Sequence, residues 1–145
     1  MDDVMRATMS TGQAEAVAAG LDLSTRIMMG QIDEIATLAR MNMLLVRDDD
    51  AEGGARRATA DEADDIETHA RAIAAILGHR SGSFGLGAKG FPIEGRRQYE
   101  VKKVIDKALA DTRDPHGVGV HHDGLTVRYT RDEEPCARMS RRGGD

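Results

Sequence analysis

A glycine-rich, basic stretch at residues 79–97 (HRSGSFGLGAKGFPIEGRR) contains the spacing Gly85-x-Gly87-x-x-Gly90 and is the first candidate for a phosphate-binding loop. In dinucleotide-binding folds such glycines follow a strand and open a helix. Here the preceding residues, HARAIAAILG, have a helical pattern. The P-loop pattern is also missing, because Gly90 rather than Ser or Thr follows Lys89. We therefore interpret the stretch as a connector and expect no nucleotide cofactor.

A cluster of histidines near the carboxyl end raises the possibility of a metal site. His121 and His122 are adjacent in an expected strand, so their side chains point to opposite faces. His116 lies roughly 20 Å from His122 along an extended strand. Neither Asp123 beside them nor the lone Cys136 completes a tetrahedral set with zinc-site spacing. No metal site is predicted.

The remaining candidates for catalysis stand alone in the sequence. His69 flanks the apolar seam of an expected helix, and its neighbours show no phospho-acceptor pattern, so we interpret it as structural. Cys136 lies in a polar segment and has no second cysteine to pair with. Ser-His-Asp, HExxH and paired-carboxylate patterns are missing. We expect a non-enzymatic protein; a site assembled from distant residues stays open, because it leaves no local pattern.

The composition favours a helical protein of the cytoplasm. The 145 residues are 40% hydrophobic and include no Trp, two Phe and two Tyr, so a core must consist mainly of aliphatic side chains. The longest dense apolar run, residues 41–46, is far shorter than the roughly 20 residues that span a bilayer. The first residues, MDDVMRAT, lack the pattern of a secretory signal. We expect a cytoplasmic protein without a membrane segment.

The expected fold class is mainly α (α+β), with a three-helix core and a C-terminal β-hairpin. Residues 1–20 are poorly defined apart from a possible short helix at 13–19. Residues 21–130 form a single domain, and residues 131–145 read as a disordered tail. The three helices are expected at about residues 24–46, 59–77 and 95–111, with a charged, solvated loop at 48–58.

Local signals define the ends of these helices. Ser24 or Thr25 is the expected N-cap of the first helix. Thr59 and Glu62 have the spacing of a capping box at the start of the second. Gly78 supplies the stop of that helix. The second helix is therefore the best-specified element of the chain.

The hairpin is expected within residues 117–130 (GVGVHHDGLTVRYT), where the hydrophobic period changes to two. Asp123-Gly124 is the signature of a type I′ turn. A two-residue loop pairs Val120 with Val127, so that nearly all apolar side chains fall on one face. Turn type and alternation therefore agree on one register.

Two apolar features predict a protein interface. Residues 41–46 are apolar on almost every side, and such a segment needs neighbours in all directions, either from the same domain or from a partner chain. The second helix carries a two-heptad apolar seam suited to a helical hairpin or bundle. We expect a regulatory interaction protein that self-associates and binds a protein partner. The expected interface residues are Met41, Met43, Leu44, Leu45, Val46, Ile66, Ile73 and Leu77.

The basic residues support a second interpretation. Residues 1–80 hold 8 Lys and Arg against 15 Asp and Glu, whereas residues 81–145 hold 12 against 10. The order helix, helix, basic helix, hairpin resembles the arrangement of a winged helix, so nucleic-acid binding is the alternative function. The expected contacts are Arg80, Lys89, Arg96, Arg97, Lys102, Lys103, Arg128 and Arg131. The net charge of −5 and the gap of about sixteen residues between the second and third helices favour the protein-binding interpretation.

A third interpretation combines the two. The acidic half of the chain would occupy the basic groove of a nucleic-acid-binding protein, as a small inhibitor does. The net acidity is compatible with this arrangement and does not select it.

Overall fold

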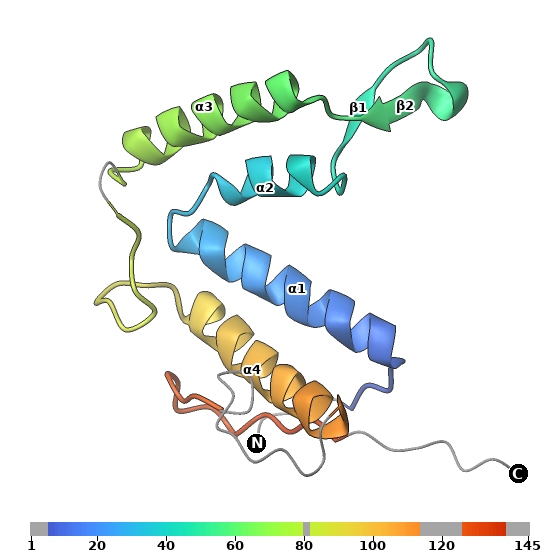
Figure 1. Cartoon of the computed structure of the whole chain (residues 1–145). Coiled ribbons are helices and arrows are strands. Elements are labelled where there is room, and N and C mark those ends of the chain that lie inside the picture. Colours follow the sequence, from blue (N-terminus) through green and yellow to red (C-terminus); the bar gives the residue numbers. More distant parts are fainter. Residues whose placement is uncertain (1–5, 80–81, 114–125, 139–145) are drawn as a thin grey trace, which may run out of the picture. The chain divides into compact units, whose positions relative to one another are not determined.

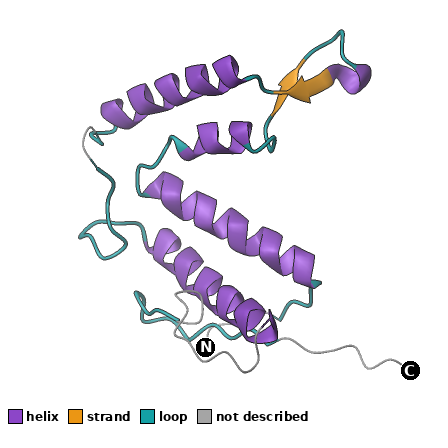
Figure 2. Ribbon diagram, viewed as in Figure 1, coloured by secondary structure: helices purple, strands orange, loops and turns teal. Residues whose placement is uncertain are grey.

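A computed structural model describes residues 6–79, 82–113 and 126–138 of the chain. The fold is mainly helical, with a small two-stranded antiparallel sheet in the middle of the chain (Figures 1 and 2). The elements are, in order, α1 (Thr11–Met28), α2 (Glu34–Arg40), β1 (Leu45–Arg47), a short 3-10 turn (Glu52–Gly54), β2 (Ala55–Arg57), α3 (Ala60–Ile76) and α4 (Ile93–Arg113). No helix in these ranges is long and apolar enough to cross a membrane.

The chain divides into two compact units. Residues 1–25 and 92–145 form one, called here the α4 unit, and residues 26–91 form the other, called the α3 unit. The single domain expected for residues 21–130 stays a prediction. Each unit positions a different set of side chains.

Helix α1 begins where Ser10 and Gln13 exchange hydrogen bonds: the Gln13 side chain accepts from the Ser10 amide at 2.8 Å, and the Ser10 hydroxyl accepts from the Gln13 amide at 3.2 Å. This reciprocal pair is a capping box, with Gln at the third position. The short helix expected at 13–19 is confirmed as part of α1. The N-cap expected at Ser24 or Thr25 is wrong, because the Thr25 hydroxyl donates to the Leu21 carbonyl inside the helix.

The single helix expected over residues 24–46 is also wrong. Gly30 has a φ of +90°, in the left-handed region, and it separates α1 from α2. Asn42, with a φ of +58°, follows the end of α2, and the chain then enters β1. The apolar period continues across both turns, so periodicity alone gives no sign of them.

The observed β-hairpin lies mid-chain instead of at the carboxyl end. β1 and β2 pair antiparallel, with Val46 opposite Arg56, and β2 occupies part of the segment expected to be a loop. Gly53 and Gly54, at φ of +80° and +72°, make the turn between them. Of the hairpin expected at 117–130, residues 117–125 lie outside the described residues, and residues 126–130 belong to no strand.

Helix α3 confirms its local signals. The Thr59 hydroxyl accepts from the Glu62 amide at 3.2 Å, and the Glu62 carboxylate accepts from the Thr59 amide at 2.9 Å, which is the expected capping box. Gly78 follows the helix at a φ of +87°. The helix packs on α2 through small side chains: Ala36, Ala39, Ala63 and Ala70 are buried.

Helix α4 extends the third expected helix by about one turn overall and packs on α1 in the α4 unit. Their shared core consists of Ala14 and Ala18 from α1 and Ile105 and Leu109 from α4, with Ala137 packed against it. Residues 131–138, expected as the start of a disordered tail, therefore contact the fold. The rest of that tail, residues 139–145, lies outside the described residues.

Candidate interaction surface

The second half of α3 exposes large apolar side chains. The helix turns Ala63 and Ala70 towards α2, and its carboxyl end carries Ala72, Ile73, Ile76 and Leu77, which are exposed. We call these four residues the α3 patch. Ile76 is 84% exposed. Burying an Ile or Leu side chain is worth about 1.5–3 kcal/mol, so this face favours a neighbour.

A second apolar group lies at the turn from α2 into β1. Met41, Met43 and Leu45 are exposed, with Leu45 at 67%, and we call them the hairpin patch. Asn42 takes a left-handed conformation between the two methionines. Met side chains adapt to irregular surfaces, which suits contact with a partner protein.

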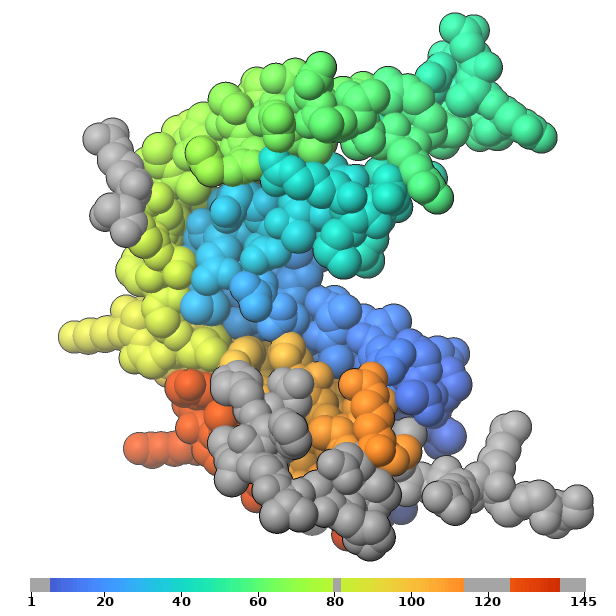
Figure 3. All heavy atoms as spheres, in the orientation of Figure 1, coloured from blue at the N-terminus to red at the C-terminus, as the bar shows by residue number. Residues whose placement is uncertain are grey.

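Ion pairs fix α2 against α3 and place the two patches. Arg40 at the end of α2 binds Asp64 at 2.7 Å and Glu67 at 2.5 Å, both in the first half of α3. Glu67 also binds Arg71, one turn further along α3. The hairpin patch follows Arg40 in the chain, whereas the α3 patch lies beyond Arg71. The two patches therefore occupy opposite ends of the α2–α3 pair (Figure 3).

A second cluster of charges fastens the β-hairpin to the start of α3. The Arg56 guanidinium donates to both Glu62 carboxylate oxygens, at 2.7 and 2.8 Å, and to Asp48 at 2.9 Å. The hydrogen bonds from Arg56, followed by those from Thr59, lower the pKa of Glu62 to about 2. The hairpin therefore depends on polar contacts rather than on an apolar core of its own.

The eight residues expected at the interface do not form one continuous group. Met41, Met43, Leu45, Ile73 and Leu77 are exposed at the two ends just described, whereas Leu44, Val46 and Ile66 are half-buried. Ile76, the most exposed of the large apolar side chains, was missed, because the expected seam runs through Ile73 and Leu77 and passes it by.

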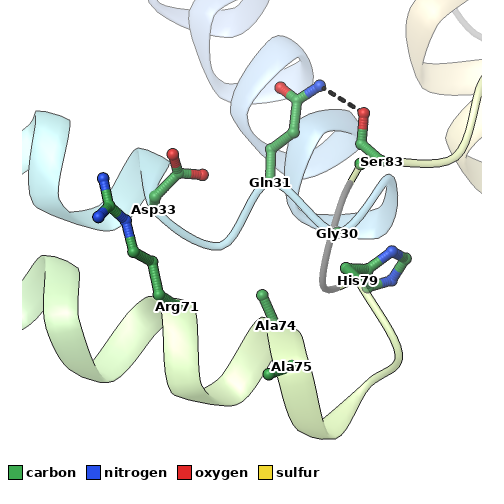
Figure 4. Close-up of a pocket in the computed structure, with 9 residues that line it drawn as sticks. Gly30, Gln31, Asp33, Arg71, Ala74, Ala75, His79 and Ser83 are labelled. Atoms are coloured by element: carbon green, nitrogen blue, oxygen red, sulfur yellow. Dashed lines mark hydrogen bonds between the residues drawn. The ribbon is translucent and has the colours of Figure 1, made fainter.

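A cleft of about 440 Å³ lies where the segment after α3 returns to the turn between α1 and α2 (Figure 4). The Gln31 side-chain amide donates to the Ser83 hydroxyl at 3.2 Å across it. The His79 ring lies so close to Gly30 that a Cβ there would be 2.5 Å from the ring, and it meets Phe84 edge to face at 5.0 Å. These groups hold the segment in place, and we assign the cleft a structural role.

The expected nucleic-acid contacts of α4 are engaged within the fold. Arg97 binds Asp132 at 2.5 Å. Lys102 binds Asp106 at 2.5 Å and has Asp22 at 3.7 Å. Burial lowers the pKa of Lys102, and these two carboxylates outweigh that effect, so its pKa lies above the ordinary value. The ammonium group therefore stays charged, with its charge balanced inside the α4 unit.

The other expected contacts are scattered. Lys103 is 1% exposed and so faces away from any ligand in solution. Arg128 donates to the Asp132 carbonyl. Arg96 is half-buried, and Lys89 and Arg131 are exposed. Arg80 lies outside the described residues.

Sequence reasoning missed one residue of this region entirely. Glu100 is 2% exposed, and its carboxylate accepts hydrogen bonds from the amides of Tyr129 and Thr130 and from the Thr130 hydroxyl. Burial raises its pKa, and the hydrogen bonds together with the charge of Arg128 outweigh that effect, so the pKa lies below its ordinary value. In the sequence Glu100 is one acid among the polar residues of an amphipathic helix, and no local signal marks it.

Within residues 6–79, 82–113 and 126–138, no group of three or more His, Cys, Asp or Glu side chains is arranged to hold a metal ion. The candidate metal residues His116, His121, His122 and Asp123 lie outside these ranges. The features that remain are the apolar patches of the α3 unit and the buried Glu100 of the α4 unit.

No protein-family model, no curated protein and no solved structure matches the chain. The surfaces described above are therefore the basis for a functional proposal.

Proposed function

We propose that this chain is a non-enzymatic, regulatory interaction protein that self-associates through the α3 patch and binds a protein partner through the hairpin patch. The observation that supports this proposal is the exposure of Ile73, Ile76 and Leu77 at the carboxyl end of α3, a helix that packs on α2 through Ala63 and Ala70. Isolated apolar side chains on a surface are common, but several on consecutive turns mark an interaction site.

The charge pattern of α3 favours a second copy of the chain as the occupant of the α3 patch. Acidic residues, among them Asp61, Asp64 and Asp65, fill the first half of the helix, whereas Arg71 is the charged residue nearest the patch. Two α3 helices packed antiparallel about Ile73 bring the patches together and keep the acidic halves at opposite ends. A parallel pair would place like charges side by side, which is unfavourable. Ala72 is small enough to let the two helices approach closely.

A cytoplasmic location is part of this proposal. Its support is the single exposed Cys136, which has no second cysteine in the chain for a disulfide.

Sedimentation equilibrium of the full chain tests self-association. We expect a dimer for the wild type and at least about a hundredfold weaker association for the double variant Ile73→Lys, Ile76→Lys, because each charge would be buried without a partner. Val17→Lys is the matched control, since Val17 is an exposed apolar residue of α1 outside the patch. A wild-type chain that stays monomeric at several hundred micromolar, or a double variant that dimerises as well as the wild type, contradicts the proposal.

Nucleic-acid binding is the second proposal, and the exposed Lys89 and Arg131 are its support. It has less support than self-association, because Lys103 is buried and Arg97 and Lys102 bind carboxylates. Fluorescence anisotropy of a labelled duplex and a labelled single strand at two salt concentrations tests it. Binding that falls steeply with salt and is lost in the variant Arg96→Ala, Arg97→Ala supports this function. No binding at low salt eliminates it.

A further inference from the structure

A short segment of the chain lies along α4 and is held there by directed contacts. We call this segment, residues 128–132, the strap (Figure 1). The strap is separated from its contacts on α4 by about thirty residues of sequence. These contacts belong to the α4 unit alone and have no part in the self-association proposed above.

Glu100 is the centre of these contacts. One carboxylate oxygen accepts from two successive backbone amides, those of Tyr129 and Thr130, the latter at 2.5 Å. The other oxygen accepts from the Thr130 hydroxyl at 2.8 Å. The Glu100 side chain is 2% exposed, so its carboxylate has few hydrogen bonds to water. Losing the donors of the strap without a replacement would therefore destabilise the folded chain. Whatever lies on this face must therefore supply a bent backbone whose two successive amides point to one oxygen, and a hydroxyl.

Two further contacts on α4 select the flanking residues. The Tyr129 ring meets the Tyr99 ring edge to face, with ring centroids 6.3 Å apart. Arg97 binds the Asp132 carboxylate through two nitrogens, at 2.5 and 3.3 Å. Read along the strap, the contacts define the pattern Tyr-Thr-Xaa-Asp. Arg131, at the open position, is exposed.

We propose that the face of α4 formed by Arg97, Tyr99 and Glu100 is a peptide-recognition site that the strap occupies, and that it accepts instead a Tyr-Thr-Xaa-Asp segment of a partner protein in the same bent conformation. The charge complementarity of Arg97 towards an acidic residue two positions after the threonine supports this choice of partner.

The nature of the contacts makes the strap replaceable. They are mainly polar, and both Arg128 and Tyr129 remain exposed, so the strap buries little apolar surface. A segment held this way stays bound mainly because the chain tethers it, which gives it an effective concentration of about a millimolar. The strap is therefore an intramolecular competitor, and weakening it exposes the site.

The test uses a labelled peptide with the sequence of residues 126–134 (TVRYTRDEE) and the full chain. The variant Thr130→Val, Asp132→Ala weakens the strap and leaves α4 intact. We expect it to bind the peptide at least about tenfold more tightly than the wild type does, because the competitor is lost. Glu133→Ala is the matched control on an exposed neighbour and should bind as the wild type does. Adding Arg97→Ala to the weakened variant should abolish the gain.

Three results overturn the proposal: equal peptide binding by the wild type and the weakened variant, binding that survives Arg97→Ala, or a weakened variant that binds a labelled duplex in preference to the peptide. A strap exchanged between two copies, seen as a dimer that the peptide dissociates, overturns the choice of a separate partner. The Ile73→Lys, Ile76→Lys variant separates this result from the proposed self-association, because it retains the strap.

A second measurement needs no variant. Excess unlabelled peptide should accelerate hydrogen exchange at the amides of Tyr129 and Thr130 in the wild-type chain, because a displaced strap loses its hydrogen bonds to Glu100. Unchanged exchange at both amides with saturating peptide also overturns the proposal.

Discussion

The two units differ in the charged side chains that they bury and in the largest apolar side chains that they expose. The α4 unit buries charged groups, Glu100 and Lys103, and covers its aliphatic core. The α3 unit keeps its ion pairs near the surface and exposes Ile76 and Leu45. Buried charge is stable only when its partners are fixed, whereas exposed apolar surface favours association. Under the two proposals, the α3 unit contacts other chains through exposed apolar side chains, whereas the α4 unit recognises a peptide through fixed polar contacts.

The interface between α2 and α3 explains why large apolar side chains of the α3 unit stay exposed. Ala36, Ala39, Ala63 and Ala70 line it, so the two helices approach closely and bury little apolar area per residue. The larger side chains lie on the other faces. Ion pairs and caps therefore contribute more to this unit than they do where a larger aliphatic core exists.

The largest effect expected is for Glu100→Ala in the α4 unit. The change leaves the amides of Tyr129 and Thr130 without their acceptor, and we expect a loss of about 3 kcal/mol in the free energy of unfolding. Urea denaturation measures the loss, and hydrogen exchange at the two amides locates it. Glu94→Gln, an exposed acid on the same helix, is the control. Unchanged exchange at both amides would contradict the assignment of Glu100 as the anchor of the strap.

In the α3 unit the corresponding position is a glycine. Gly30→Ala forces a side chain into a φ of +90° and places its Cβ 2.5 Å from the His79 ring, so we expect a loss of about 2 kcal/mol. Gly20→Ala is a control with the opposite expected sign. Gly20 lies inside α1, and nothing lies within 4 Å of a Cβ at this position, so the substitution should stabilise the chain by about 0.5–1 kcal/mol. Thermal denaturation of both variants distinguishes the two signs. A neutral Gly30→Ala would show that His79 moves away freely.

The same comparison explains what the sequence predicts well. Helix α3 was predicted because its signals lie within a few residues of one another: the Thr59 and Glu62 cap, the acidic first turn and Gly78. Helix α4 was predicted from its own period. Residues 41–46 were predicted to be a helix end covered by the domain's own helices or by a partner chain; they form a turn and a strand, and Met41, Met43 and Leu45 are exposed.

Features that depend on distant residues were missed. At the break at Gly30, the His79 ring packs on the glycine from 49 positions away in the chain. Glu100 is buried because Tyr129 and Thr130 lie on it, 29 and 30 residues away. Val46 pairs with Arg56 because of a glycine turn inside a segment that reads as a charged loop. In each case the local pattern is compatible with two conformations, and a tertiary contact selects one.

A smaller effect is expected at the start of α3. Thr59→Ala removes the hydroxyl that caps the Glu62 amide, and we expect a loss of about 1 kcal/mol. Thr68→Ala is the matched control within the same helix. Its hydroxyl donates to the Asp64 carbonyl, a bond that contributes little inside a helix, so its removal should be neutral or slightly stabilising. Chemical denaturation of both variants measures the difference. Equal losses would mean that the cap contributes no more than an ordinary surface threonine.

The smallest effect expected is a difference between the two units in how strongly salt changes the pKa of a carboxyl group. Both Glu62 and Glu100 have a lowered pKa, so each stabilises the folded chain at a pH above its ordinary pKa. This stabilisation is lost as the pH falls, and for Glu62 the loss occurs between about pH 4.5 and about pH 2. Glu62 is held by a partly exposed guanidinium, and 1 M NaCl should raise its pKa towards the ordinary value. Glu100 is held mainly by buried hydrogen bonds, which salt does not screen, so its pKa should move less. Carboxyl-carbon NMR titrations at low and high salt measure both groups in one sample. Equal shifts would show that the charge of Arg128 lowers the pKa of Glu100 as strongly as the charge of Arg56 lowers the pKa of Glu62. The two units would then differ in burial but not in electrostatics.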